Sequence, residues 1–260
     1  MLINRVRQAY KEKKPSFGAY VMTPAPKIVE MMGFAGLDFV RIDLAETPMD
    51  LETVHHMIRA AHAVGITPFV RVPPGQARLV ELALHMGALG IQISRVSSRA
   101  DVERAVQATK AAPVGERHAS TSLFTAGMGT MSNEEHLNWV NENIMLSVQV
   151  ETRQGIEAID EIVSVPGLDM VQSGRGDLSY EYGVPGQQYH PVVLEAERKM
   201  IAAGKKAGKL VSVQYYPLND PDHVETIRGF IRQGVDCLSL GTDRELVSVY
   251  RRLLGEIKRA

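Results

Sequence analysis

Eight short apolar segments, most of them followed by a longer amphipathic segment, recur along the chain and constrain its fold more than any other feature. The longer segments place apolar residues at three- and four-residue spacing, as helices do, and the short ones are typical of buried strands. We expect strands at residues 17–22, 39–45, 67–72, 90–96, 144–151, 168–174, 209–216 and 236–243. This alternation predicts a (β/α)8 barrel in one domain over residues 1–260, with a doubly wound open sheet as the alternative.

Glycines and one long insertion refine this prediction. Several predicted helices end at a glycine just before the next strand, as expected for a left-handed residue that terminates a helix. These glycines are Gly36, Gly65, Gly87, Gly208 and Gly234.

The segment at about 113–143 departs from the alternation of strands and helices and is rich in Gly, Ser, Thr, Met and His. In a barrel, we expect such an insertion to cover the active face or to pack against another subunit.

Composition narrows the class of partner. The 29 basic and 30 acidic side chains leave a net charge of -1, which provides no electrostatic footprint for nucleic acid or an anionic membrane. The basic N-terminus lacks the apolar core of a signal peptide, and no later apolar stretch reaches about 18 residues. The single cysteine, Cys237, lies in an apolar stretch that suits a buried hydrophobe better than a nucleophile. We therefore expect a cytoplasmic protein that acts on a small molecule.

Two carboxylates follow neighbouring predicted strands. Glu151 closes the segment IMLSVQVE, and Asp177 lies just past LDMVQSG in the turn GRGDLS. Active sites of barrels are built at the carboxyl ends of the strands, so both side chains would reach the same mouth. Hard oxygen ligands with room for water suit Mg2+ or Mn2+. The alternative is that Glu151 pairs with Arg153 and that Asp177 is a helix N-cap.

Other polar residues occupy similar positions. Arg71 lies at the carboxyl end of FVRVPP, where its guanidinium would bind a carboxylate or an enolate oxygen, or would form a salt bridge in the barrel mouth. Asp43 and Glu46 follow the second strand in RIDLAETP, and His85 lies near the end of the third helix. Glu46 could instead cap the next helix, and His85 could be a helix C-terminal histidine.

The turn GRGDLS has a further property. Gly174 and Gly176 flank Arg175, so backbone amides can approach an anion closely. The spacing is not that of a phosphate-binding P-loop, and we do not predict a nucleotide site.

Several motifs resemble the HpcH/HpaI family of metal-dependent aldolases, which includes 4-hydroxy-2-oxoheptanedioate and 2-dehydro-3-deoxyglucarate aldolases. The matching stretches cover nearly the whole chain, and the most specific are VQVET and GDLS. The others are EMMGFAGLDFVRID, FVRVP, the YG that follows GDLS, AGK and LGTD.

The resemblance implies a (β/α)8 barrel that cleaves a 4-hydroxy-2-oxo acid to a 2-oxo acid such as pyruvate and an aldehyde, through a metal-stabilised enolate. It implies that Glu151 and Asp177 hold a divalent cation (Mg2+, Mn2+ or Co2+), that Arg71 neutralises the enolate, and that the backbone amides of Gly174, Arg175 and Gly176 hold the substrate carboxylate. It also implies a homo-oligomer, a hexamer or trimer, whose subunits exchange the last helix.

The chain departs from the family pattern at the acid/base group. The family usually reads Asp-Gly-Glu-His-Ala-Pro where this chain reads Asp-Leu-Ala-Glu-Thr-Pro at 43–48, so Glu46 replaces the histidine. The aspartate that supports this histidine is replaced by His85. We hypothesise that Glu46 and His85 form the same carboxylate–imidazole pair with its order reversed. In addition, Tyr20 stands in the substrate site where the family commonly has tryptophan. Arg175 replaces a proline of the family pattern. Its charge could favour a more anionic substrate, or its side chain could point to solvent or to another subunit.

Competing functions remain open at this point. No lysine closes a strand in these motifs, which disfavours a Schiff-base aldolase. A decarboxylase, another lyase or a hydratase acting on a 2-oxo acid would keep the metal and the enolate. A metal-binding protein that has lost catalysis is the third alternative.

Overall fold

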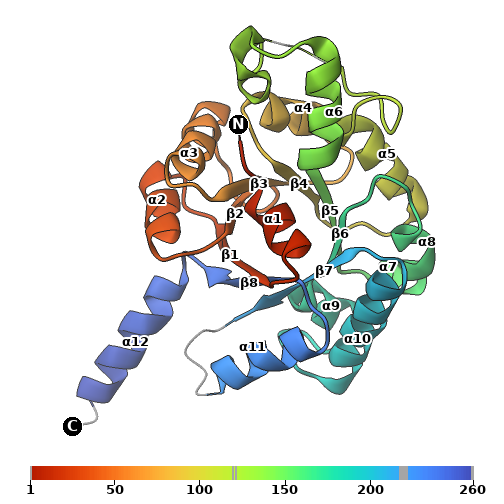
Figure 1. Cartoon of the computed structure of the whole chain (residues 1–260). Coiled ribbons are helices and arrows are strands. Elements are labelled where there is room, and N and C mark those ends of the chain that lie inside the picture. Colours follow the sequence, from red (N-terminus) through yellow and green to blue (C-terminus); the bar gives the residue numbers. More distant parts are fainter. Residues whose placement is uncertain (1, 119, 121, 217–221, 259–260) are drawn as a thin grey trace.

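All eight expected strands form, and they close into a parallel barrel in sequence order (Figure 1). The structure is a computed structural model that describes residues 2–118, 120, 122–216 and 222–258. The strands are β1 (Ser16–Val21), β2 (Phe39–Asp43), β3 (Thr67–Val72), β4 (Gly90–Ile93), β5 (Met145–Val150), β6 (Met170–Ser173), β7 (Leu210–Tyr215) and β8 (Cys237–Thr242). The predicted (β/α)8 architecture is confirmed, and the open-sheet alternative is wrong because β8 pairs with β1.

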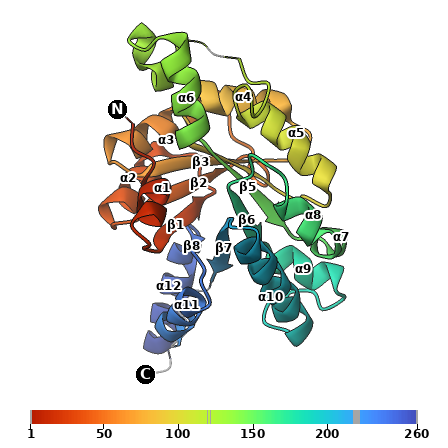
Figure 2. The same ribbon diagram turned by 45° about the vertical axis from the view of Figure 1, so that its right-hand side comes forward.

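Helices surround the barrel (Figures 1 and 2). They are α1 (Arg5–Lys11), α2 (Pro26–Phe34), α3 (Leu51–Ala63), α4 (Ala77–His85), α5 (Arg99–Thr109), α6 (Asn133–Asn143), α7 (Arg153–Glu157), α8 (Ile159–Val163), α9 (Arg175–Glu181), α10 (Pro191–Lys206), α11 (His223–Arg232) and α12 (Glu245–Ile257), with a 3-10 helix η1 (Phe124–Gly129). The five glycines expected to end helices all have positive φ, between +68° and +103°. Within the described residues, no helix combines the length and apolar character needed to cross a membrane.

Two apolar clusters hold the barrel together. The larger one lies between the strands and the surrounding helices, where outward-facing Val, Ile and Leu side chains of the strands are fully buried. The smaller one fills the amino end of the barrel interior and includes Phe39, Phe69 and Met170, together with Val6 from α1. Parallel strands buried on both faces read as continuous apolar runs, which is why these segments were recognisable.

The insertion at 113–143 packs on the outside of the barrel. It contains η1 and α6, and α6 begins at a capping box in which Ser132 and Glu135 bond each other's backbone amides. Phe124 of η1 contacts the His62 ring, with 5.2 Å between ring centroids, at the amino-end side of the barrel. No lining residue of the main cavity comes from this insertion in the part that the structure describes, so covering the active face of its own chain is wrong.

Candidate metal and substrate site

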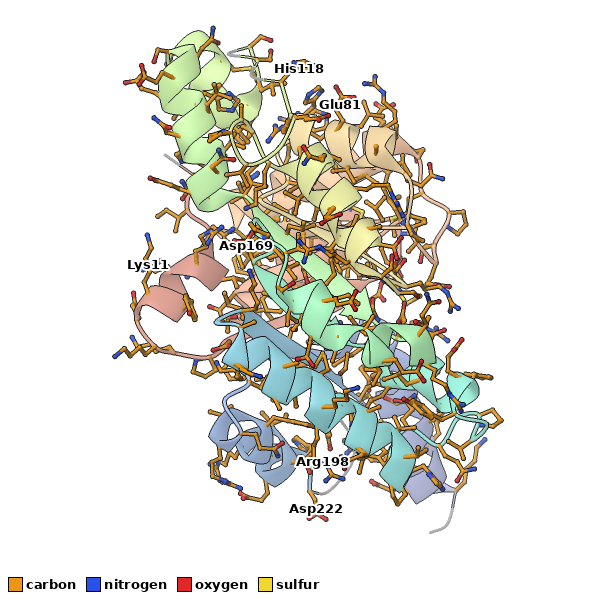
Figure 3. The ribbon with its side chains drawn as sticks, turned by 90° about the vertical axis from the view of Figure 1, so that its right-hand side faces the viewer. Lys11, Glu81, His118, Asp169, Arg198 and Asp222 are labelled. Atoms are coloured by element: carbon orange, nitrogen blue, oxygen red, sulfur yellow. The ribbon has the colours of Figure 1, made fainter. Side chains whose placement is uncertain are left out.

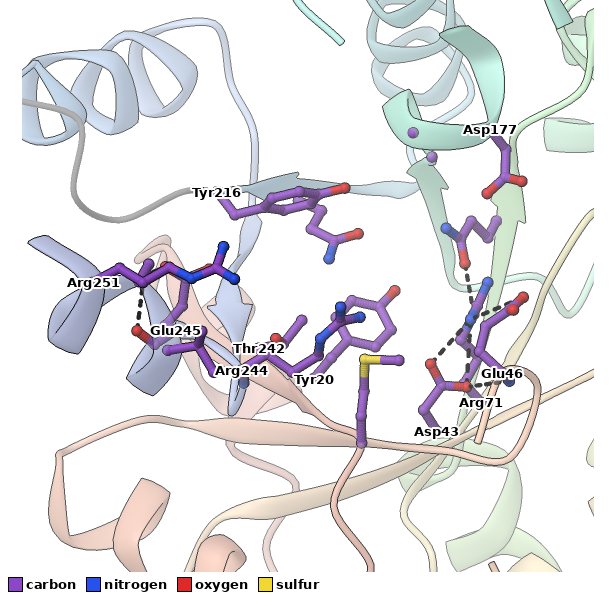
Figure 4. Close-up of a pocket in the computed structure, with 17 residues that line it drawn as sticks. Tyr20, Asp43, Glu46, Arg71, Asp177, Tyr216, Thr242, Arg244, Glu245 and Arg251 are labelled. Carbon is purple, nitrogen blue, oxygen red and sulfur yellow. Dashed lines mark hydrogen bonds and ion pairs between the residues drawn. The ribbon is translucent and has the colours of Figure 1, made fainter. Parts of the chain in front are cut away.

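A cavity of about 590 Å3 opens at the carboxyl ends of the strands (Figure 4). It is built from strand ends, from the first turn of α9 and from the start of α12. The residues that line it are Tyr20, Met22, Asp43, Glu46, Arg71, Gln149, Gly174, Gly176, Asp177, Gln214, Tyr216, Thr242, Arg244, Glu245, Val247, Ser248 and Arg251. Most of the predicted site residues therefore come together in one place, as the barrel rule requires.

Glu151 follows β5 and is fully buried, so it does not itself line the cavity but lies 3.6 Å from Arg71, which does. Its Oε1 accepts a hydrogen bond from the Arg95 amide at 3.0 Å, and its Oε2 has no partner among the described residues. Burial raises the pKa of Glu151 to about 8, Arg71 opposes this shift, and nearby Asp177 adds to it. The suggested Glu151–Arg153 pair is wrong: the Arg153 amide donates to Glu181 at 3.2 Å, and its guanidinium lies over Tyr182.

Asp177 lies inside the first turn of α9, not at its N-cap. Gly174 is the N-cap residue and provides no side-chain hydrogen bond, so the capping alternative is wrong. The Asp177 side chain is about half exposed, and its Oδ1 lies 3.2 Å from Arg95 Nη1. Its effect on the pKa of Glu151 indicates that the two carboxyl groups adjoin.

These two carboxyl groups fit a divalent cation. A buried carboxylate oxygen without a partner is costly, and a cation shared with Asp177 would satisfy it. Gly174 makes room for this arrangement, because a Cβ there would collide with Glu151 and lie 2.8 Å from the Gln149 amide nitrogen. Within the described residues no group of three or more His, Cys, Asp or Glu could hold a metal. A cation held here would therefore have two protein carboxylates, and water or substrate would complete its shell.

Arg71 connects the carboxylates around the cavity. Its Nη1 lies 3.0 Å from Asp43 and 3.7 Å from Glu46, and its Nη2 lies 3.6 Å from Glu151. Its Nε donates to the Gln149 side-chain oxygen at 3.0 Å. Burial alone would lower the pKa of Arg71, but Tyr20 and the carboxylates raise it above its ordinary value. The guanidinium therefore stays charged. The predicted salt bridges in the barrel mouth are confirmed and Arg71 also lines the cavity, whereas its binding of a carboxylate or enolate oxygen stays a prediction.

Asp43 and Tyr20 both line the cavity. Asp43 accepts hydrogen bonds from the Ala45 and Glu46 amides at 2.9 and 3.1 Å, which fixes the loop after β2. The Tyr20 hydroxyl lies 2.6 Å from Gln172 Nε2 and 3.1 Å from Gln92 Oε1. Burial raises the pKa of Tyr20, so its ring is a neutral wall of the cavity.

Glu46 and His85 do not come together within one chain. Glu46 lines the cavity beyond the carboxyl end of β2, whereas His85 ends α4 at the amino-end side of the barrel. The His85 imidazole lies 3.9 Å from Glu81, which Figure 3 shows on the same outer side as His118. Burial and Arg117 lower the pKa of His85. The predicted pair is thus not formed inside the subunit, because a helix carries the chain back across the barrel between the two positions.

The Arg175 side chain turns away from the cavity. Its Nε lies 3.3 Å from buried Glu197 on α10, and its Nη2 donates to the Gln214 carbonyl at 2.5 Å. The guanidinium also lies over the rings of Tyr189 and Phe230. The expectation that this charge faces the substrate, solvent or another subunit is therefore wrong. The backbone of Gly174, Arg175 and Gly176 still forms the turn beside Asp177.

Three arginines of the site escaped the sequence prediction. Arg95 follows β4, has a positive φ of 51° and touches both Glu151 and Asp177. Its position just past an apolar strand was the signal that could have found it. Arg244 is the N-cap of α12 and Arg251 lies in the middle of that helix, and charged residues on an amphipathic helix carry no such signal.

Comparison with known proteins agrees with the family resemblance seen in the sequence. The sequence profile described as HpcH/HpaI aldolase/citrate lyase matches residues 16–248. A hydroxypyruvate/pyruvate aldolase of Deinococcus radiodurans is 30% identical over 98% of this chain and 89% of its own length. A 5-keto-4-deoxy-D-glucarate aldolase of Shigella sonnei is 28% identical over 92% of this chain and 91% of its own length.

Solved structures agree with these relatives. An HpcH/HpaI aldolase from Desulfitobacterium hafniense superposes with a TM-score of 0.89 at 26% identity, covering 98% of this chain and 96% of that one. The citrate synthase SbnG superposes with a TM-score of 0.84 at 31% identity, covering 97% of this chain and 96% of that one.

Proposed function

This chain belongs to the HpcH/HpaI aldolase/citrate lyase family and is an aldolase-type lyase, and we propose that it cleaves a 4-hydroxy-2-oxo acid to pyruvate, or a related 2-oxo acid, and an aldehyde. The observation that supports this proposal best is the buried Glu151 carboxyl, with an unpartnered oxygen, beside Asp177 and Arg71. Such a group is arranged to bind a cation next to an anionic substrate.

In this proposal Glu151 and Asp177 hold Mg2+, Mn2+ or Co2+. A divalent ion there would draw electron density from the carboxylate and keto oxygens of a 2-oxo acid. The Arg71 guanidinium is placed to stabilise the negative charge that develops on the keto oxygen when the bond between C3 and C4 breaks. The Gly174 amide donates to the Val150 carbonyl at 3.3 Å, so the expectation that it holds the substrate carboxylate is wrong, and we propose that the first-turn amides of Arg175 and Gly176 donate to that carboxylate.

Proton transfer requires a base near the 4-hydroxyl group. Glu46 lies in the cavity 3.7 Å from Arg71, and its side chain is 57% exposed. We propose that its carboxylate accepts the hydroxyl proton as the aldehyde forms, and that a proton is then delivered to C3 of the product. His85 joins this step only if a neighbouring subunit supplies it, because it lies away from the cavity of its own chain.

We also propose a cytoplasmic homo-oligomer, a hexamer or trimer, in which α12 is exchanged. No residue of α12 is buried, and Figure 1 shows this helix projecting from the barrel. Leu246, Tyr250, Leu253 and Ile257 are each between 49% and 62% exposed on it. An apolar stripe of this size on a helix normally packs against another protein surface.

A second candidate function is formation of a carbon–carbon bond, as in the citrate synthase that this chain resembles at 31% identity. The observation that favours this candidate is that similarity, which extends over 97% of the chain with a TM-score of 0.84. The same cavity residues would then stabilise an enolate that attacks a second 2-oxo acid.

Deuterium exchange into pyruvate tests the proposed aldolase without knowledge of the aldehyde. The purified protein is incubated with pyruvate in D2O with Mg2+, Mn2+ or Co2+, and the methyl proton signal is followed by NMR. We expect metal-dependent exchange that stops with a chelator and in Glu151→Gln, and that slows by about 10²-fold in Glu46→Ala. His85→Ala slows it as well only if the neighbouring subunit contributes. Metal binding without exchange would exclude pyruvate as the 2-oxo acid that this protein releases.

A further inference from the structure

A second arginine lies inside the barrel, beneath the cavity. Arg41 of β2 is fully buried, and it faces the barrel interior together with Asp43, because residues two apart on a strand share one side. Its guanidinium donates to the hydroxyl of Ser239, and to that of Ser212 at 3.2 Å. In the part of the chain that the structure describes, no carboxylate forms an ion pair with it, and burial lowers its pKa. A buried cation without a counter-ion is costly, so packing alone does not explain this residue.

Three aromatic rings surround the Arg41 guanidinium. Its Cζ lies 4.6 and 5.6 Å from the ring centroids of Phe39 and Phe69, which belong to the apolar cluster at the amino end of the barrel. It also lies 5.6 Å from the centroid of the Tyr20 ring, and the Arg71 guanidinium lies 5.9 Å from the same centroid. Since Tyr20 lines the cavity (Figure 4), the charge of Arg41 lies just beneath the cavity wall.

A chain of buried hydrogen bonds leads from Arg41 to the acceptor of Arg71. An arginine can only donate, so Ser212 uses its own hydroxyl proton on the next group, and each later group is oriented in turn. The bonds run from Ser212 to Gln172 Oε1 (3.0 Å), from Gln172 Nε2 to the Tyr20 hydroxyl (2.6 Å), from that hydroxyl to Gln92 Oε1 (3.1 Å) and from Gln92 Nε2 to Gln149 Oε1 (3.4 Å). Arg71 Nε donates to the same Gln149 oxygen at 3.0 Å.

The direction of this chain fixes the Gln149 amide. Two donors hold its oxygen, so its Nε2 group is turned the other way, where it lies 2.8 Å from the position of a Cβ added at Gly174, a residue of the cavity wall. Each group donates to the next one on the way from Arg41 to the cavity, and hydrogen bonds aligned in this way polarise one another. All of these side chains come from strands of one barrel, so the chain of bonds is independent of the subunit that supplies α12.

We propose that Arg41 is a positioning residue: its charge and this oriented chain hold Arg71 and Gln149 in place and strengthen the attraction of the barrel mouth for the anionic oxygen of an enolate. The inference rests on the proposed function, because the enolate is taken to form beside Arg71. A unit charge that acts over about 10 Å at an effective dielectric constant of about 20 changes the affinity for an anion by about tenfold.

A role in folding and a role in the site make opposite predictions for Arg41→Met. If the arginine served the fold alone, its loss would lower the midpoint of urea unfolding. A buried cation without a counter-ion destabilises the folded state, so an apolar side chain of similar length should leave that midpoint close to the parent's or raise it. A lower midpoint would therefore assign Arg41 to the fold and overturn the inference.

Oxalate, a dianion that resembles the enolate of pyruvate in shape and charge, tests the site without turnover. Its dissociation constant is measured by calorimetry on the full-length protein with Mg2+. We expect about tenfold weaker binding in Arg41→Met, and recovery of most of the affinity in Arg41→Lys, which keeps a charged donor at this position. Parental affinity in Arg41→Met, or a loss that Arg41→Lys does not restore, would overturn the inference.

A matched pair of serine variants tests the chain of bonds. Ser212→Ala interrupts the chain and should weaken oxalate binding by about threefold to tenfold. Ser147 is also fully buried, two residues before Gln149 on β5, and its hydroxyl has no partner among the described residues, so Ser147→Ala should bind oxalate as the parent does. Equal affinities of the two variants would overturn the role of the chain.

These measurements are separate from the test of the proposed function. Oxalate binding requires no pyruvate exchange. Exchange in the parent protein together with unchanged oxalate affinity in Arg41→Met refutes the positioning role alone. Oxalate binding that depends on Arg41, in a protein that does not exchange pyruvate, refutes the release of pyruvate alone.

Discussion

Glu151 is the residue on which the electrostatics of the site depend. It is fully buried, its pKa is raised to about 8 mainly by that burial, and one of its oxygens has no partner in the described structure. Arg71 and the Arg95 amide compensate part of this cost. A protein keeps an uncompensated buried carboxyl where a ligand completes it, which is why this residue carries the metal proposal.

Gly174 should be essential for metal binding. In Gly174→Ala, the added Cβ would lie 2.6 Å from the Glu151 Cβ, so Glu151 or the turn must move. Displacing a ligand in this way typically costs about 10–100-fold in metal affinity, which a titration of the purified protein with Mn2+ would measure.

Gly176→Ala is the matched control for this variant. Its added Cβ would meet Tyr216 Oη at 3.5 Å, an ordinary contact, so the affinity for Mn2+ should stay close to that of the parent protein. Circular dichroism checks that both variants are folded. Mn2+ affinity in Gly174→Ala equal to that of the control would contradict the assigned ligand.

At the scale of elements, α9 and α12 position the two ends of the cavity. The first turn of α9 presents Asp177, while Arg175 anchors that turn through Glu197 of α10. Helix α12 has no buried residue of its own, and its two faces differ: Arg244, Ser248 and Arg251 face the cavity, and its apolar stripe is exposed.

A charge on the apolar stripe should weaken assembly. Leu246 and Leu253 are 62% and 49% exposed in the single chain. If the stripe is covered in an oligomer, full burial of each leucine stabilises the interface by about 1.5–3 kcal/mol. Leu246→Asp with Leu253→Asp should therefore give a smaller particle in sedimentation equilibrium. Arg252→Asp, on the polar side, should not change the mass, and the idea fails if the double variant has the same mass as the parent.

At the scale of the whole molecule, α1 closes the barrel at the end opposite to the site. Val6 joins the inner cluster at the amino end, and the Asn4 side chain donates to the carbonyls of Leu89 and Asn143 at 3.1 and 2.8 Å. Figure 1 shows α1 across the centre of the strands. The substrate cavity therefore opens on the carboxyl side, while the other end is filled.

Val6→Ala should destabilise the barrel measurably. Val6 is 1% exposed, and the loss of its methyl groups leaves a cavity among large side chains. We expect the free energy of unfolding to fall by about 2 kcal/mol in urea at fixed protein concentration. Ile3→Ala, at a side chain that is 65% exposed, should change it by less than about 0.5 kcal/mol. Equal effects of the two substitutions would mean that α1 does not seal the barrel.

Sequence alone determined the eightfold barrel and the placement of Glu151, Asp177, Arg71 and Glu46 at one mouth. Both follow from local rules: strand and helix periodicities are visible in the chain, and the carboxyl ends of parallel strands share a face. The prediction from the sequence that Glu151 and Asp177 hold a divalent cation remains to be tested.

Tertiary structure decided where side chains point once the chain has left a strand. Arg175 and Glu197 are far apart in sequence, and their ion pair turns the arginine out of the cavity. Helix α4 separates Glu46 from His85, and the left-handed backbone of Arg95 directs its amide to Glu151. Each outcome depends on packing against an element that is distant in sequence. Periodicity reports only on residues that are close along the chain, so it could not predict these contacts.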